Sequence, residues 1–370
     1  MKVKWYTVLV LLGGVILSFA DPITDILTLV EFYRADHKTW FGVGLAFVIL
    51  PCLFFLTLNC MVTCKRNEHN TDAGYCVRSL LCGFHPFSVA LSRLEGFLFY
   101  LKQLMRGDEI DSVAEAKNDM DLNIFYHVFF ESALEAAPQF VIQLYAVNVQ
   151  EEPVTVVQII SLPVSFLSLA WAFTAVDVKM HKGGNARKVK YKLALFLTQV
   201  LLLSSRLFAI SYFTVSYKWW VLSVLFLHVF VLVITESICI CQRGLCHSRV
   251  PFLLIFFHCV DWLIDDVAGL ILNTHVESKK ELRRMQLFSN VLFVLENVVM
   301  ILLYYFSQHS NNWYSLPVTI CVCVVSVLAA VARVTLCHFL RKDDETVNSQ
   351  SNNNNNNSPT DECKQWISTV

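Results

Sequence analysis

The sequence predicts an all-α polytopic membrane protein with eight transmembrane helices plus two re-entrant helical hairpins, arranged as two parallel pseudo-repeats. Three observations predict this fold class. The 370 residues are 55% hydrophobic and only 16% charged, whereas a soluble domain has about a quarter of its residues charged. The apolar residues come in runs of about twenty, the length that crosses a bilayer core. Basic residues cluster between some runs and not others, which marks the cytoplasmic side.

Ten apolar segments follow one another along the chain. They cover about 5–33, 41–63, 84–105, 122–148, 153–178, 193–215, 219–241, 250–272, 285–307 and 314–340. Basic clusters stand at Lys2 and Lys4, Lys65 and Arg66, Lys179 to Lys192, Arg243 and Arg249, Lys279 to Arg284, and Arg341 and Lys342. The connections at Gln150 to Glu152 and Ser307 to Asn312 lack them. The positive-inside rule then places both termini in the cytoplasm and these two connections outside.

Two of the ten segments do not fit a simple crossing. Segment 84–105 lies between cytoplasmic Arg66 and segment 122–148, which has to climb to the outer turn. Segment 250–272 lies between two basic clusters. Each therefore starts and ends on the cytoplasmic side, which predicts a re-entrant hairpin shielded by protein or water. Gly96 and Gly269 are the flexible points proposed for these hairpins.

The domain organisation follows from the same count. We expect a first membrane repeat at 1–178, a basic cytoplasmic linker at 179–192, a second repeat at 193–342 and a disordered cytoplasmic tail at 343–370. The two repeats run in the same order and start from the same side, as parallel repeats do. A cleaved signal peptide ending near Ala20 is an alternative for the first segment, but apolar character resumes after it, which favours a span.

The cysteines and the net charge exclude several classes of site and partner. Most of the thirteen Cys lie near the cytoplasmic face, and the outer turns carry none, so no extracellular disulfide framework is expected. Cys239, Cys241, Cys246 and His247 lack the spacing of a structural zinc site. S-acylation is the more plausible use of the juxtamembrane cysteines. No metal and no cofactor are therefore predicted, and a net charge of −1 argues against nucleic acid.

Ionisable residues inside the apolar segments are the candidate functional site. Asp21 and Asp25 lie four residues apart in the first segment and share a helix face. The fourth segment carries a row at spacing four, made of Glu131, Glu135, Gln139 and Gln143. Pro138 interrupts this helix and predicts a kink. The second half supplies Asp261, Asp265, Asp266, Glu296 and the counter-ion Arg206, while Asp177 and Glu236 lie near span ends and are interpreted as interfacial.

The cost of these charges leaves two interpretations open. A charge at the bilayer centre costs about 2.5–3.5 kcal/mol. If they were unpaired, six groups would together cost roughly 15–20 kcal/mol; they are Asp21, Asp25, Glu131, Glu135, Arg206 and Glu296. They therefore pair with one another, as polar residues that tie helices together do, or they line a hydrated path for an ion, a polar solute or a lipid headgroup. No nucleophile or phosphate-binding glycine loop is visible, so we do not expect an enzyme.

One stretch of the fourth segment resembles a known family. The residues Glu131 to Gln139, continuing through Gln143 to Tyr145, are similar to the E-x-x-P-Q-x-x-x-Q-x-Y signature of XK-related proteins. The pair Asp21 and Asp25, the stretch Ser168 to Trp171, the basic run after it and Ser205-Arg206 also resemble family positions, and the likeness runs from about residue 1 to 342. It implies a phospholipid scramblase that moves lipids, including phosphatidylserine, between plasma-membrane leaflets without ATP.

The resemblance also implies which residues carry the function and which features are missing. Asp21, Asp25, Glu131, Glu135 and Arg206 match the charged family positions, with Asp177 and Glu296 matching less closely. Some family members are activated in apoptosis by caspase cleavage of the tail. Here the tail contains no Asp-x-x-Asp, so a caspase switch is not favoured. The outer turn 307–312 has no cysteine for a covalent partner.

The expected partners are membrane phospholipids and, through the C-terminus, a PDZ protein. Ser368, Thr369 and Val370 provide the hydroxyl and terminal aliphatic side chain that a PDZ groove accepts. A single-span accessory subunit is a further candidate partner. Two functional alternatives remain, a non-scrambling membrane anchor or adaptor for partner or lipid-transfer proteins, and an ion- or solute-coupled transporter using the same acids.

Overall fold

The fold was analysed in a computed structural model, which describes residues 5–66, 87–106, 128, 131–180, 189–242, 279–307 and 313–354. In these ranges the regular structure is helical. The chain divides into two compact units, unit 1 at Met1–Val176 and unit 2 at Asp177–Val370. The units are described one at a time below.

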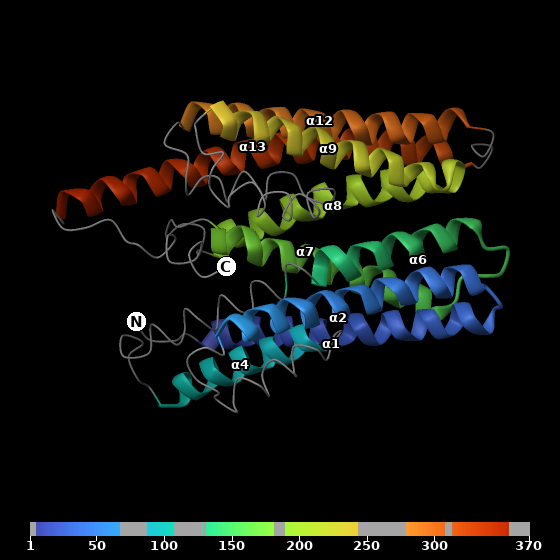
Figure 1. The fold of residues 1–370 in the computed structure, drawn as a ribbon, viewed down its shortest axis with the longest axis horizontal. Coiled ribbons are helices and arrows are strands. Elements are labelled where there is room, and N and C mark those ends of the chain that lie inside the picture. Colours follow the sequence, from blue (N-terminus) through green and yellow to red (C-terminus); the bar gives the residue numbers. More distant parts are fainter. Residues whose placement is uncertain are drawn as a thin grey trace. The chain divides into compact units, whose positions relative to one another are not determined.

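In its described residues, unit 1 contains four long helices and a broken one. They are α1 (Trp5–Arg34), α2 (Lys38–Arg66), α4 (Ser88–Arg106), the π-helical turn η2 (Ser132–Ala136) with α6 (Ala137–Val149), and α7 (Val156–Met180), whose end belongs to unit 2. Helix α1 packs against α2 and α4, and α2 also packs against η2 and α6 (Figure 1). A tight turn at Asp36, with φ of 60°, reverses the chain between α1 and α2.

Among its described residues, unit 2 contains four long helices, α8 (Val189–Tyr217), α9 (Trp220–Gln242), α12 (Lys279–Phe306) and α13 (Ser315–Asn354). Helices α8, α12 and α13 pack against one another, and α9 packs against α8. Figure 1 shows α12 and α13 running side by side. Leu202, Phe293 and Ala329, one from each of the three mutually packed helices, form a common core cluster.

The protein is a multi-pass membrane protein. Within the described ranges, five helices are long and apolar enough to cross a bilayer, at Trp5–Arg34, Val156–Val178, Val189–Tyr217, Leu287–Phe306 and Ser315–Leu336. Shorter apolar helices cover Lys38–Leu53 and Trp220–Thr235. The all-helical membrane class is therefore confirmed, while the count of eight spans and two hairpins stays a prediction.

Two details of the prediction are corrected. Helix α4 runs without interruption from Ser88 to Arg106 and passes through Gly96, because one glycine costs a helix only about 1 kcal/mol relative to alanine. The proposed flexible point at Gly96 is wrong, and segment 250–272 with Gly269 lies outside the described residues. Helix α13 continues to Asn354, so the first residues of the expected disordered tail are helical.

Candidate functional site

The break at Pro138 takes the form of a π-helical turn. Proline lacks an N–H and clashes with the carbonyl four residues earlier, so a regular helix cannot pass through it unchanged. Here η2 widens the helix just before it, and the backbone N–H of Ala137 bonds to the carbonyl of Ser132, five residues back. Such turns are frequent at functional sites. The regular α-helical hydrogen bonding is thus interrupted just before Pro138, while the predicted kink stays a prediction.

The polar row of the fourth segment is buried, but its side chains contact different neighbouring helices. Glu135, Gln139 and Gln143 are each at most 3% exposed, and Glu131 is half-buried. Gln139 donates a 2.7 Å hydrogen bond to the carbonyl of Gly44 in α2, whereas Gln143 points to α1 and α7. A spacing of four advances around the helix by about 40° per step, so successive side chains reach different neighbours.

Gln143 and Asp25 are the centre of a hydrogen-bond network across α6, α1 and α7. The amide of Gln143 donates to Asp25 Oδ1 at 2.8 Å and accepts from the Ser161 hydroxyl at 2.8 Å. Ser165 also donates to Asp25 Oδ1, at 3.2 Å, and Thr28 donates to Ser161 at 3.3 Å. Buried polar groups are costly unless they are bonded in this way. The network therefore holds the carboxylate of Asp25 in place between three helices.

Asp21 lies one turn from Asp25 in α1, close to Ser165, Ser168 and Arg93. Arg93, from α4, attracts both Asp21 and Glu131 and donates a 3.1 Å hydrogen bond to the carbonyl of Gly14. Arg93 was not among the predicted site residues. It stands as a charge inside apolar segment 84–105, the same signal that identified Arg206.

In unit 2, Arg206 and Glu296 form a buried ion pair. Their Nη1 and Oε2 atoms are 3.0 Å apart, and the side chains are 0% and 15% exposed. Nη1 of Arg206 also donates to Asn297 at 3.1 Å, and the guanidinium lies 4.9 Å from the ring centroid of Phe293. Pairing is one of the two interpretations left open by the sequence, and Arg206 and Glu296 adopt it. Asn297, a neutral residue, carried no charge signal in the sequence.

The third member of this cluster is His228 of α9. Its Nδ1 atom lies 2.8 Å from Glu296 Oε2, and the side chain is 1% exposed. Glu296 thus has Arg206 of α8 on one side and His228 of α9 on another. His228 was not predicted, although it is the one titratable residue between Trp220 and Thr235.

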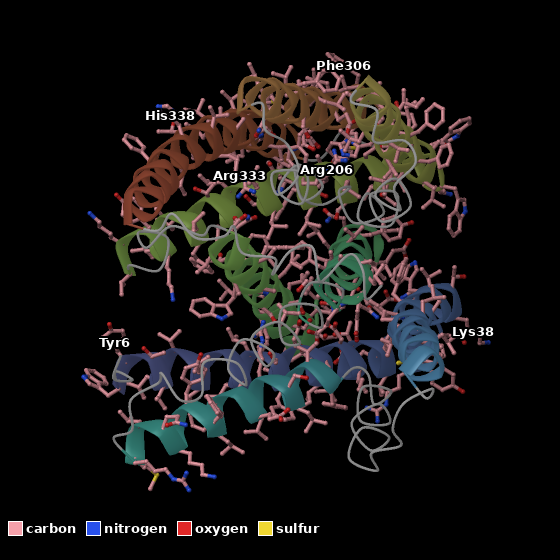
Figure 2. All side chains as sticks on the ribbon, turned by 60° about the vertical axis from the view of Figure 1, so that its left-hand side comes forward. Tyr6, Lys38, Arg206, Phe306, Arg333 and His338 are labelled. Atoms are coloured by element: carbon pink, nitrogen blue, oxygen red, sulfur yellow. The ribbon has the colours of Figure 1, made fainter. Side chains whose placement is uncertain are left out.

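Asp177 pairs with Arg333. Arg333 Nη1 of α13 lies 2.6 Å from Asp177 Oδ2, and the Gln199 amide of α8 donates to the same oxygen at 2.5 Å. Asp177 and Arg333 are each 2% exposed, so Asp177 lies in the interior of unit 2 near the end of α7 rather than exposed at the span end. Figure 2 shows Arg206 and Arg333 apart from each other in unit 2, so these are two separate ion-pair sites. Arg333, like Arg93, was missed despite lying in an apolar segment.

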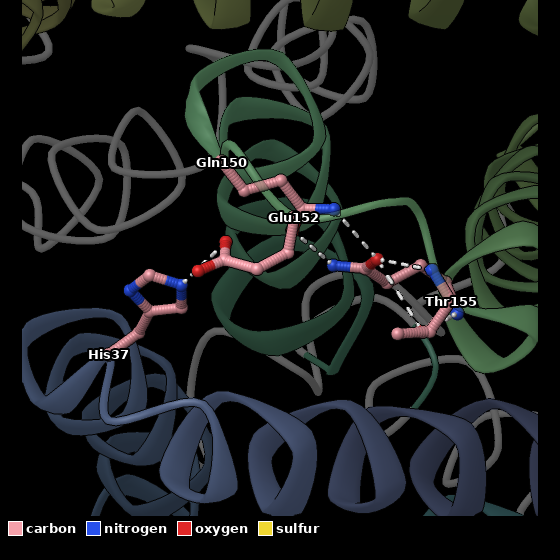
Figure 3. Close-up of polar contacts among 5 residues, drawn as sticks. His37, Gln150, Glu152 and Thr155 are labelled. Atoms are coloured by element: carbon pink, nitrogen blue, oxygen red, sulfur yellow. Dashed lines mark hydrogen bonds and ion pairs between the residues drawn. The ribbon is translucent and has the colours of Figure 1, made fainter.

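A further polar cluster joins the two turns at one end of unit 1 (Figure 3). His37, in the α1–α2 turn, lies 3.5 Å from Glu152 in the α6–α7 connection, and its ring stacks on Trp40 at 4.0 Å. Gln150 and Gln158 exchange hydrogen bonds of 3.1 and 2.9 Å. The connection that was predicted to face outside is thus fixed to its neighbours.

Several candidate residues lie beyond the described parts of the chain. They are Asp261, Asp265 and Asp266, the cysteines Cys76, Cys82 and Cys246, and the C-terminal Ser368, Thr369 and Val370. Nothing is described of the Glu236 side chain. In the described ranges, no group of three His, Cys, Asp or Glu side chains is arranged to hold a metal ion.

The geometry therefore places Asp25, Asp177 and Glu296 in membrane-length helices, each bonded to protein partners. The sequence model of XK-related proteins matches residues 9–341. The chain belongs to the XK-related family. Its similarity to XK-related protein 9 of Tetraodon nigroviridis is 25% identity over 193 residues, which covers 46% of this chain and 47% of that relative. That match thus spans about half of the relative's length. The family signature from Glu131 to Tyr145 lies in the described residues across η2 and α6.

Proposed function

We propose that this protein is a phospholipid scramblase of the plasma membrane, with both termini in the cytoplasm. One observation supports this most strongly: Asp25, Asp177 and Glu296 lie in helices of an XK-related membrane protein, and every one of them is bonded to neutral or basic side chains from other helices. A zwitterionic headgroup carries both charges that these side chains carry. Its ammonium group can replace the partner of a carboxylate, and its phosphate can replace the partner of a basic side chain. The acyl chains stay in the membrane during this exchange.

Weak, repeated binding positions suit this transport better than one tight site, because a lipid has to leave as readily as it enters. Gln143 and Ser165 are neutral partners of Asp25, while Arg206 and Arg333 are charged partners of Glu296 and Asp177. We propose that lipid headgroups pass by exchanging places with these protein partners, without a covalent step. We also propose that the protein has eight membrane spans and two re-entrant hairpins. Phospholipids are then the principal partners; an accessory subunit or a PDZ protein remains a proposed addition.

The test is lipid movement by the purified full-length protein in liposomes that carry a fluorescent phospholipid. Dithionite bleaches only the outer leaflet, so loss of signal beyond half reports scrambling. Two truncations, after Lys342 and after Asn354, separate the helical extension of α13 from the residues behind it. Activity only in the protein truncated after Lys342 makes the helical extension an inhibitor. Activity in the full-length protein shows an open scramblase. Folded protein with no activity in any form refutes the proposal.

Glu135→Gln and Asp36→Asn form a matched pair within this assay. Glu135 is 3% exposed among the buried acids, whereas the Asp36 side chain is 80% exposed in a turn and pairs with Lys38. A lipid path predicts folded Glu135→Gln protein with altered scrambling and unchanged activity of Asp36→Asn. Acids that only tie helices together predict loss of folded Glu135→Gln protein.

The anchor or adaptor function is the second candidate, and α13 favours it. This helix runs from Ser315 to Asn354, beyond the span that ends at Leu336. A helix that leaves the bilayer offers a surface for a partner protein. Folded protein that binds a partner through residues 337–354 and moves no lipid would establish this alternative. No specific observation in the described residues favours the transporter.

A further inference from the structure

The His228–Glu296 contact joins α9 to α12 inside the membrane. Among the described helices of unit 2, α9 packs on α8 less extensively than α8, α12 and α13 pack against one another. His228 reaches past this arrangement to Glu296 at 2.8 Å. The contact therefore links α9 directly to the acid that pairs with Arg206.

The rest of this part of α9 offers little to replace that contact. Leu222, Phe226, Leu227 and Phe230 are exposed, as expected of side chains that face lipid. The Thr235 hydroxyl bonds to the carbonyl of Val231 in its own helix. Interactions between apolar side chains and lipid tails give little preference for one helix position over another, so polar contacts and close packing decide where a membrane helix sits.

Glu296 is the member of the cluster that surrounding molecules can reach. Arg206 is fully buried and His228 is 1% exposed, whereas 15% of the Glu296 side chain is exposed. Moving α9 away would remove one partner of Glu296 Oε2 and leave Arg206 and Asn297 in place. The freed carboxylate oxygen would then accept a bond from an ammonium group, the cationic part of a phosphatidylethanolamine or phosphatidylserine headgroup.

From this juxtaposition we infer that His228 is a positioning residue that keeps α9 against Glu296 and competes with the lipid ammonium group for the same carboxylate oxygen. The role in lipid movement rests on the proposed scramblase function. The role in holding α9 does not, because it follows from the contact alone. In the described arrangement His228 contacts the carboxylate of Glu296. This arrangement is the resting state, in which the lipid ammonium group has no access to that oxygen.

The test compares His228→Leu, His228→Asn and Thr235→Val in the full-length protein in lipid nanodiscs and liposomes. Amide hydrogen exchange of residues 220–235 reports how firmly α9 is held, and fluorescent phosphatidylethanolamine reports scrambling. Interhelical hydrogen bonds in membranes contribute about 0.6–1.7 kcal/mol, so loss of the contact in His228→Leu should speed both exchange and scrambling about threefold to eighteenfold. Asn keeps an N–H close to the position of Nδ1, so His228→Asn should stay near wild type, as should Thr235→Val.

A double variant distinguishes positioning from simple packing. In a Glu296→Gln background, His228→Leu should add no further acceleration, because the competition for the carboxylate is already gone. Unchanged amide exchange in His228→Leu would overturn the inference, and so would faster exchange with slower scrambling. If no form of the protein moves lipid, the proposed function fails, and amide exchange alone then supports or overturns the role of His228 in holding α9.

Discussion

Gln143 of α6 donates a 2.8 Å hydrogen bond to Asp25 of α1, a residue 118 positions earlier in the chain. Both side chains are buried, at 0% and 2% exposure. The pair belongs to a network that also includes Ser161 and Ser165 of α7. A single amide thereby fixes the positions of three helices, and it makes unit 1 sensitive to a change that removes no charge.

Replacing Gln143 by leucine tests this network. Asp25 would lose its amide partner and Ser161 its acceptor, and an unsatisfied buried polar group costs about 1–3 kcal/mol. We expect Gln143→Leu to lower the free energy of unfolding in detergent by about that amount. Asn148→Ala is the control, because the Asn148 amide bonds to Leu144 in its own helix. Equal losses in the two variants would contradict a role of Gln143 between helices.

The ion pair in unit 2 should show strong coupling between its members. Removing one partner of a buried pair costs about 3–5 kcal/mol, whereas replacing both by apolar residues is often close to neutral. Arg206→Met and Glu296→Leu should each destabilise unit 2 strongly, and the double variant should lose much less than the sum. Thermal unfolding of the four proteins in the same detergent measures this coupling. Additive losses would show that the two side chains contribute independently.

Two glycines of α2 should respond to alanine in opposite directions. A Cβ at Gly44 would lie 2.5 Å from Leu29 Cδ2 and 3.3 Å from Gln139 Oε1, whereas a Cβ at Gly42 meets nothing within 4 Å. Crowding a packed contact costs about 1–3 kcal/mol, so we expect Gly44→Ala to destabilise the protein. Gly42→Ala should instead stabilise it by up to about 1 kcal/mol, because alanine favours helix. Unfolding curves measure both effects, and a stabilised Gly44→Ala would contradict the close approach of α2 to Leu29 of α1 and Gln139 of α6.

The turn cluster of Figure 3 combines a weak and a strong contact. The Glu152 side chain is 59% exposed beside His37, and exposed ion pairs contribute about 0–1 kcal/mol. Gln158 is 3% exposed and bonds to Gln150 and Thr155. Glu152→Gln should therefore leave stability nearly unchanged, while Gln158→Leu should cost about 1–3 kcal/mol because Gln150 and the Thr155 amide lose their partner. A larger loss from Glu152→Gln than from Gln158→Leu would contradict this ranking.

The sequence by itself determined the membrane class, the family and most of the candidate acids. These depend on local properties, since run length, basic clusters and the Glu131 to Tyr145 signature can be read without knowing which helices touch. Arg93 and Arg333 were visible by the same criterion as Arg206 and were missed. His228 and Asn297 carried no charge signal, because a neutral residue in an apolar run resembles an ordinary core residue.

Only the tertiary structure decided which groups bond to which. Asp25 could have paired with any base in an apolar segment, yet it is bonded to Gln143 and Ser165, while Asp177 pairs with Arg333 and Glu296 with Arg206 and His228. The π-helical turn before Pro138 and the continuous helix through Gly96 were likewise decided there. The physical reason is that spacing along the chain sets the face of one helix, whereas a bond between helices depends on how several helices pack.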